Sequence, residues 1–318
     1  MAASKNRLRW DEMPESARAA VEKLIAGRVM AAENCEGGFS PGLASRLVLD
    51  DGRQVFVKAI DAAAWPVQAG FYRSEATVAA ALPGTVAAPR LIGALDAGRW
   101  VALAFEWIAG PQPRQPWHPA ELDRVLAAVA EHARAMTPSP IELPRDHPRL
   151  GGWDRLARDS DRLARLPAHS AWAAGHLPLL MRLEELGRDS AQGTSLVHFD
   201  LYPHNILLTP DRVLFADWPH ARLGAPFIDL LTVLCSTVAS GIDPEPALAA
   251  HPLTASLDPR IIDAFLAALA GFYFDGALEP RPPGLAPVTA AKFRLAEDTL
   301  RWLVRRLGST GQAAELPG

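Results

Sequence analysis

Cysteine is scarce in this sequence, which contains only Cys35 and Cys235 among its 318 residues. The two lie far apart and match no metal-binding or redox spacing. A cysteine without such a motif is most often a small buried hydrophobic residue. The sequence therefore predicts two buried free thiols.

Long apolar runs and long basic runs are also missing. No uninterrupted apolar segment approaches the roughly 18 residues of a membrane span, and the polar stretch Met1–Trp10 lacks the apolar core of a signal peptide. A net charge of −4 gives no electrostatic reason to expect nucleic acid or an acidic membrane surface as a partner. These absences predict a cytoplasmic protein with small-molecule partners, long enough for two domains or lobes.

The P-loop pattern Gly-x-x-x-x-Gly-Lys-Ser/Thr is absent, which disfavours a P-loop kinase. A different glycine-rich segment, residues 36–42, lies between two apolar runs. Its glycines permit close backbone approach to a triphosphate, so Gly38, Phe39 and Ser40 are candidate nucleotide-binding residues. A plain turn is the alternative, because Pro41 removes one amide donor.

The first third of the chain predicts an antiparallel sheet with two helices. Apolar segments separated by turn residues predict strands, and apolar residues at helical spacing predict helices. The expected strands are residues 28–35, 43–49, 54–60, 90–95 and 100–105, and the expected helices are 10–26 and 71–82.

A lysine interrupts one apolar strand face. Alternation over residues 54–60 places Phe56 and Lys58 on the same face. On the following helix, a stripe that begins at Phe71 includes Glu75, which would be costly to bury without a positive partner. We therefore expect a Lys58–Glu75 ion pair in a nucleotide site that also includes Phe56. A lysine that reaches solvent from an edge strand is the simpler alternative.

The densest group of polar candidates lies in residues 196–217. Two apolar runs, Ile206–Leu208 and Val213–Asp217, flank the turn residues 209–212 and predict a hairpin. His198, Asp200 and Asn205 precede its first strand, and Asp217 ends its second. The hairpin should therefore bring together oxygen ligands of the kind that suit magnesium. Turn or capping roles are the alternative for any one of these residues.

The order His198-x-Asp200, Asn205 and Asp217 resembles the catalytic loop and metal-binding Asp of the kinase fold. The motifs His198-Phe199-Asp200 and Asp217-Trp218-Pro219 resemble those of the aminoglycoside phosphotransferase family, whose members are small-molecule kinases. The resemblance implies that Asp200 is the catalytic base, that Asn205 and Asp217 hold magnesium, and that the backbone near Glu106, Trp107 and Ile108 meets the adenine. It also implies that Asp229 braces the catalytic loop; a helix-start carboxylate is the alternative.

The resemblance implies an α+β, two-lobed, protein-kinase-like fold with a nucleotide-binding lobe at residues 1–108 and a helical lobe at 109–318. Helical patterns after the linker fit that expectation, at residues 119–136, 155–166, 172–186, 259–274 and 287–307, with another opening near 224–231.

The implied reaction is transfer of the γ-phosphate of ATP, or GTP, with magnesium, to a hydroxyl of a small molecule. An aminoglycoside-like antibiotic is the leading candidate acceptor. Family members often have Gly, His and Gly where this chain has Phe199, Tyr202 and His204, and the last two could reshape the acceptor pocket.

Three other interpretations remain open. A metabolite kinase acting on choline, homoserine, a sugar or a secondary metabolite would use the same motifs. A nucleotide-binding module without catalysis is a second possibility, although the intact set of Lys58, Asp200, Asn205 and Asp217 speaks against it. The third is a transition-metal site formed by His198, Asp200 and His204.

Overall fold

The computed structural model describes residues 7–35, 40–143 and 150–310. The chain divides into two compact units, each built from segments that are separated in sequence. The first unit is Met1–Pro113, Pro140–Leu143 and His198–Ala221; the second is Arg114–Ser139, Pro144–Val197 and Arg222–Gly318. Division into functional lobes after residue 108 stays a prediction.

An antiparallel sheet of five strands forms the centre of the first unit, in the order β1-β2-β3-β5-β4. Each strand overlaps an expected one, and the tight β4–β5 connection uses Gly98 at a φ of +61°, a conformation that glycine adopts readily. The strands are β1 (Val29–Asn34), β2 (Leu43–Leu49), β3 (Gln54–Asp61), β4 (Leu91–Ala97) and β5 (Trp100–Glu106).

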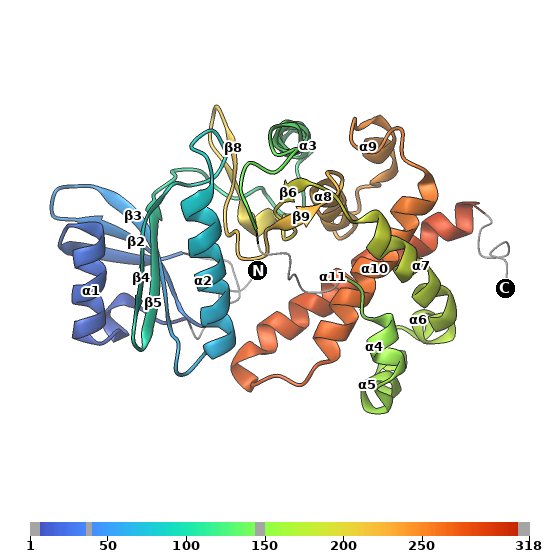
Figure 1. The fold of residues 1–318 in the computed structure, drawn as a ribbon, viewed down its shortest axis with the longest axis horizontal. Helices are drawn as coiled ribbons and strands as arrows, with labels where there is room; N and C mark the ends of the chain where they lie inside the picture. Colours follow the sequence, from blue (N-terminus) through green and yellow to red (C-terminus); the bar gives the residue numbers. More distant parts are fainter. Residues whose placement is uncertain (1–6, 36–39, 144–149, 311–318) are drawn as a thin grey trace. The chain divides into compact units, whose positions relative to one another are not determined.

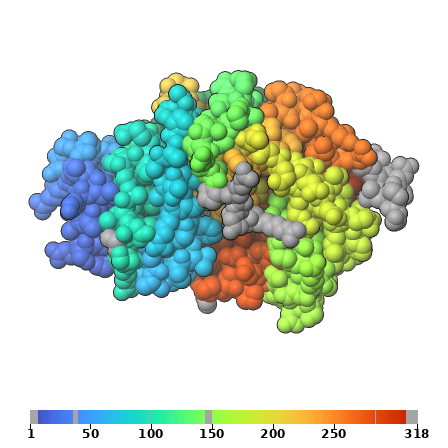
Figure 2. Space-filling model, in the orientation of Figure 1, coloured from blue at the N-terminus to red at the C-terminus, as the bar shows by residue number. Residues whose placement is uncertain are grey.

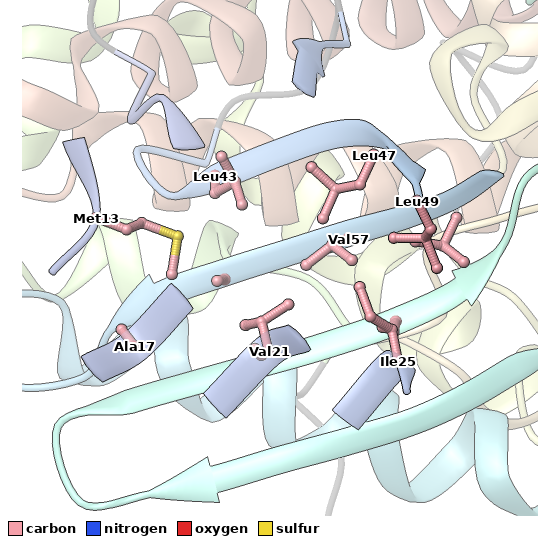
Figure 3. Close-up of a cluster of buried hydrophobic side chains, with 12 residues drawn as sticks. Met13, Ala17, Val21, Ile25, Leu43, Leu47, Leu49 and Val57 are labelled. Carbon is pink, nitrogen blue, oxygen red and sulfur yellow. The ribbon is translucent and has the colours of Figure 1, made fainter. Parts of the chain in front are cut away.

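Two helices cover opposite faces of this sheet (Figure 1). Helix α1 (Glu15–Ile25), preceded by the 3-10 turn η1 (Trp10–Glu12), lies on one face, and α2 (Pro66–Ala81) lies on the other. Figure 3 shows Val21 and Ile25 of α1 pointing toward Leu47 of β2. Full burial of one such side chain stabilises the fold by about 1.5–3 kcal/mol.

Helix α2 buries Glu75 and Val78 of the expected stripe but not Phe71. Its buried residues are Ala69, Tyr72, Glu75 and Val78, spaced three apart, whereas Phe71, where the expected stripe began, is 39% exposed. The helix starts earlier, at Pro66, and Tyr72 rather than Phe71 shares the inward face with Glu75. The opposite side of α2, in cyan, forms part of the visible surface in Figure 2.

The second unit is mostly helical. Its helices are α3 (Pro119–Ala135), α4 (Trp153–Ala157), α5 (Ser160–Arg165), η2 (Leu166–Ala168), α6 (Ala171–Gly175), α7 (Leu177–Ser190), α8 (Ile228–Val238), α9 (Glu245–Ala250), α10 (Pro259–Leu278), η4 (Pro283–Leu285) and α11 (Ala286–Thr310). A two-stranded sheet pairs β6 (Ser195–Val197) with β9 (Arg222–Gly224).

Several of these elements differ from the sequence-based expectation. The helix expected over residues 155–166 is broken, because the side chain of Asp159 accepts a hydrogen bond from Arg162 N and so starts a second helix, α5. The helix expected over 172–186 is interrupted before Pro178, which lacks an amide donor. Strands β6 and β9 and helix α9 were not predicted.

Helix α10 is long and apolar enough to cross a membrane by length and composition. Its apolar window is, however, 83% buried inside the protein, and it packs against α7 and α11 (Figure 1). That burial is typical of a core helix, so α10 is weak evidence for a membrane span. The unit also contains Cys235, a buried free thiol as predicted, whereas Cys35 in the first unit is free but only half-buried.

Candidate functional site

The predicted hairpin is present in the first unit and positions Asp217. Strand β7 (Ile206–Leu208) pairs with β8 (Val213–Phe215) in antiparallel register. Just beyond the ladder, Ala216 N donates to Asn205 O over 2.8 Å. Asp217 follows with a φ of +68°, in the left-handed region that non-glycine residues seldom adopt. The hydrogen bond and the turn place the Asp217 carboxylate beside the segment that carries Asn205.

His198 supports this arrangement from inside the unit. Its side chain is fully buried, and Nδ1 accepts a 3.3 Å hydrogen bond from Asp200 N. Since Nδ1 is the acceptor, Nε2 carries the proton and donates to Ala216 O over 2.9 Å. The imidazole thus joins the loop that holds Asp200 to the segment that ends in Asp217.

Asp200 and Asn205 contact each other directly. Nδ2 of Asn205 donates to Asp200 O over 2.8 Å and to Asp200 Oδ2 over 3.1 Å. Because the amide nitrogen is directed toward Asp200, the amide oxygen is the atom of Asn205 suited to a metal. Asn205 is buried and Asp200 is partly exposed.

Lys58 joins two carboxylates in the same unit. Its ammonium group forms the predicted ion pair with Oε2 of Glu75 and a 2.7 Å contact with Oδ1 of Asp217. Nζ also lies 5.2 Å from the centre of the Tyr72 ring and 6.0 Å from that of Phe105, within range of a cation–π interaction. The lysine that interrupts the apolar face of β3 therefore contacts both carboxylates through its ammonium group.

Burial and charge change the pKa values of all three groups. Burial acts to lower the pKa of Lys58, but Asp217 and Glu75 together raise it above its ordinary value. Burial raises the pKa of Glu75 to about 8, with Lys58 opposing the shift. Burial acts to raise the pKa of Asp217, but the charge of Lys58 lowers it to about 2. The charge of Lys58 thus favours the ionised form of both carboxylates.

A cavity of about 650 Å³ opens over this cluster, and its lining lies within the first unit. Its size suits a small-molecule ligand. Asp200 is not among its lining residues, and Gly38 and Phe39 lie outside the described residues. The remaining sequence-predicted site residues line it: Ser40, Phe56, Lys58, Glu75, Glu106, Trp107, Ile108, Asn205 and Asp217.

Sequence reasoning did not assign several other lining residues to the nucleotide site, among them Tyr72, Arg46, Arg7 and His204. Tyr72 donates to or accepts from Ser40 Oγ over 3.0 Å, Arg46 lies 5.4 Å from the Trp107 ring centre, and Arg7 and His204 also face the cavity. Tyr72 was detectable as the residue three positions before Glu75 on one helix face. Arg7 gave no signal, since no pattern connects it to residues so distant in sequence.

The oxygen-rich donor set fits magnesium better than a transition metal. Asp217 is 46% exposed at its side chain, and together with the amide oxygen of Asn205 it offers one carboxylate and one neutral oxygen. Magnesium is commonly held by one or two carboxylates and completed by water and phosphate oxygens. Among the described residues, no group of three or more His, Cys, Asp and Glu side chains could hold a metal, so the His198, Asp200 and His204 metal site has no support.

Residues 35–282 match the sequence profile of the phosphotransferase enzyme family. No curated protein matches the chain significantly. Among solved structures, the chain is similar to an amicoumacin kinase in complex with AMP-PNP and Ca²⁺, at 12% identity and a TM-score of 0.54, over 90% of this chain and 96% of that chain.

Two further structures have similar folds. A macrolide 2'-phosphotransferase type I is 16% identical with a TM-score of 0.52, over 95% of this chain and 99% of the other. A choline/ethanolamine kinase family protein from Mesorhizobium loti is 17% identical with a TM-score of 0.52, over 95% of both chains. At these identities the likeness concerns the fold, which is the predicted protein-kinase-like α+β fold.

Proposed function

Because this chain belongs to the phosphotransferase enzyme family and is a small-molecule kinase with a hydroxyl acceptor, we propose that it transfers the γ-phosphate of ATP, or GTP, in a magnesium-dependent reaction. The observation that carries this proposal is the position of Lys58, which contacts Glu75 and Asp217 inside the cavity. A lysine on a strand paired with a helix glutamate is the kinase arrangement for nucleotide phosphates.

Each residue then has a distinct task. Lys58 binds the α- and β-phosphates, and Glu75 holds the lysine in place. Asn205 and Asp217 would hold magnesium, which neutralises phosphate charge when it is bound. Ser40, Phe56 and residues 106–108 contact the nucleotide, as would Gly38 and Phe39.

Asp200 acts on the acceptor rather than on the nucleotide. Its carboxylate orients the acceptor hydroxyl and takes its proton as the new oxygen–phosphorus bond forms. The bond from the γ-phosphorus to the bridging oxygen breaks, and the nucleoside diphosphate leaves with that oxygen. Positioning provides much of the rate, since this transition state needs little covalent assistance. The absence of Asp200 from the nucleotide cavity lining is compatible with a base that faces the acceptor.

An aminoglycoside-like antibiotic is the proposed acceptor, and a metabolite such as choline, homoserine or a sugar is the alternative. Proteins with similar folds include both a macrolide phosphotransferase and a choline/ethanolamine kinase family protein. Tyr202 and His204, where the family often has His and Gly, could reshape the acceptor pocket, which is why the metabolite alternative is kept. A cytoplasmic location also remains a prediction.

The test is a screen of hydroxylated antibiotics and metabolites for acceptor-dependent ATP consumption, followed by the Asp200→Asn variant. We expect that variant to bind nucleotide normally and to lose turnover by about 10²-fold or more. Asp211→Asn is the matched control, because Asp211 lies exposed in the turn of the same hairpin. Turnover by Asp200→Asn near the wild-type rate would show that Asp200 is not the base, and labelling of generic proteins without any small-molecule acceptor would refute the acceptor class.

A further inference from the structure

Arg7 lines the nucleotide cavity, although it lies far from the other site residues in sequence. It precedes η1 and α1, and it faces the same cavity as Lys58 and Asp217. The guanidinium group offers five donors in a planar fork whose geometry suits phosphate oxygens. Its location therefore raises the question of which ligand this cation contacts.

Hydrogen bonds from Arg7 and its neighbour Leu8 reach both sides of the β1–β2 connection. Nη1 of Arg7 donates to Cys35 O over 2.6 Å, just after β1. Leu8 N donates to Pro41 O over 3.4 Å, just before β2, and Asn34 Nδ2 donates to Leu8 O over 3.3 Å. These hydrogen bonds hold the arginine at the connection that was predicted to lie over a triphosphate.

The charges of the cavity lining favour a phosphate ligand for this cation. The described lining residues include the acidic side chains Glu33, Glu75, Glu106 and Asp217 and three cations, Arg7, Arg46 and Lys58. Arg46 pairs with Glu33, and Lys58 is shared between Glu75 and Asp217. A polyanionic nucleotide needs cations to enter such a lining, since a charge removed from water requires a partner.

Arg7 is half-buried, so its charge is partly removed from water and a bound phosphate would stabilise it. Burial lowers the pKa of Arg7, and nearby Tyr72, Cys35 and Asp217 oppose the shift. The charge of Asp217 therefore favours the protonated form of the guanidinium. A phosphate bound at Lys58 would lie in the cavity that Arg7 also lines.

We propose that Arg7 binds the phosphates of the nucleotide as a second cation beside Lys58, supplied by the segment that precedes the first helix. This inference rests on the proposed phosphotransferase function. Arg7 is then a nucleotide-binding residue that contacts the phosphates and not the base. Its contribution to the binding free energy should therefore grow with the number of phosphates on the ligand.

The experiment measures dissociation constants of ATP, ADP, AMP and adenosine, with magnesium, for the full chain by calorimetry. Arg7→Gln keeps a donor for Cys35 O while removing the charge, and Arg7→Lys keeps the charge. We expect Arg7→Gln to weaken ATP and ADP binding by about tenfold or more, because a hydrogen bond to a charged group has that size. Adenosine binding should not change, and Arg7→Lys should recover part of the loss for ATP. Arg9→Met is the control, since Arg9 is exposed and pairs with Asp11.

The outcomes separate this inference from the function on which it rests. Equal weakening of all four ligands by Arg7→Gln would mean that Arg7 only supports the β1–β2 connection, and unchanged ATP binding would mean that it contacts no phosphate. Either result overturns the inference and leaves the proposed function intact. Failure of the wild-type protein to bind either ATP or GTP with magnesium would instead overturn the proposed function itself, and the inference with it.

Discussion

Two residues of the candidate site, Phe199 and Asp217, have left-handed backbones, with φ values of +66° and +68°. For residues other than glycine, this conformation costs about 1–2 kcal/mol, and it persists only where the surrounding contacts hold it. His198 supplies such contacts on both sides, to Asp200 N and Ala216 O. The family resemblance often places glycine at position 199, and the positive φ gives that preference a physical reason. Phe199 offsets the strain by being buried.

A buried histidine in the second unit should make stability depend on pH. Burial lowers the pKa of His132 to about 4 from an ordinary value of 6.5. Between these values the unfolded chain binds a proton that the native protein does not, so stability is present above pH 6.5 and is lost as the pH falls toward 4. The expected loss is about 3 kcal/mol at most.

The measurement is the free energy of unfolding against pH for His132→Gln and for wild type. We expect a flatter curve between pH 6.5 and 4 in the variant. His118→Gln, at an exposed position just before the same helix, should retain the wild-type slope. An equally steep curve for His132→Gln would assign the slope to other groups.

At the scale of elements, the packing of α7 against α10 depends on a close backbone approach. A Cβ added at Gly187 would collide with the carbonyl of Ala264. Gly187→Ala should therefore destabilise the protein by about 1–3 kcal/mol, despite the roughly 1 kcal/mol by which alanine favours a helix.

The matched control is Gly308→Ala in α11, where an added Cβ meets nothing within 4 Å. That variant should be neutral, or more stable by up to about 1 kcal/mol. Chemical denaturation of both variants checks the comparison. If Gly187→Ala proved as stable as Gly308→Ala, the two helices would have to separate more easily than their contact indicates.

The elements that could be predicted from sequence were those whose signal is local. Strand β3 alternates and α2 has a clear stripe, so the Lys58–Glu75 pair followed from two short patterns. Strand β9 has only three residues, and its partner β6 lies far back in the chain, so no periodicity could reveal it. Arg7 joined the cavity through tertiary contacts alone. The error at Phe71 came from taking the residue four positions before Glu75 as inward-facing, whereas α2 buries the residue three positions before it.

At the scale of the whole molecule, magnesium and nucleotide should stabilise the fold together. A ligand that binds only the native state, at a hundred times its dissociation constant, adds about 2.7 kcal/mol. For a chain of this size we expect the melting temperature to rise by about 4 °C with ATP and magnesium, and much of that rise to be lost when magnesium is removed by chelation.

Thermal unfolding of Asp217→Asn, with Asp211→Asn as the control in the same hairpin, tests which residue links the metal to the nucleotide. Asp217→Asn should lose the magnesium-dependent part of the shift, and Asp211→Asn should keep it. Stabilisation by zinc alone, with no response to magnesium and nucleotide, would favour the transition-metal site over the kinase interpretation.

The first unit draws its residues from three separate stretches of chain, and this affects protein synthesis. Lys58 and Asp217 are 159 positions apart, and the stretch between them includes Pro144–Val197, which belongs to the second unit. At 5–20 residues per second, a ribosome needs roughly 8–32 s to pass from one residue to the other. During this interval the five-stranded sheet is present without the β7–β8 hairpin of the same unit, and of the two carboxylates that contact Lys58 only Glu75 has been synthesised. The nascent chain therefore contains the proposed phosphate-binding Lys58 well before it contains the proposed metal-binding Asp217.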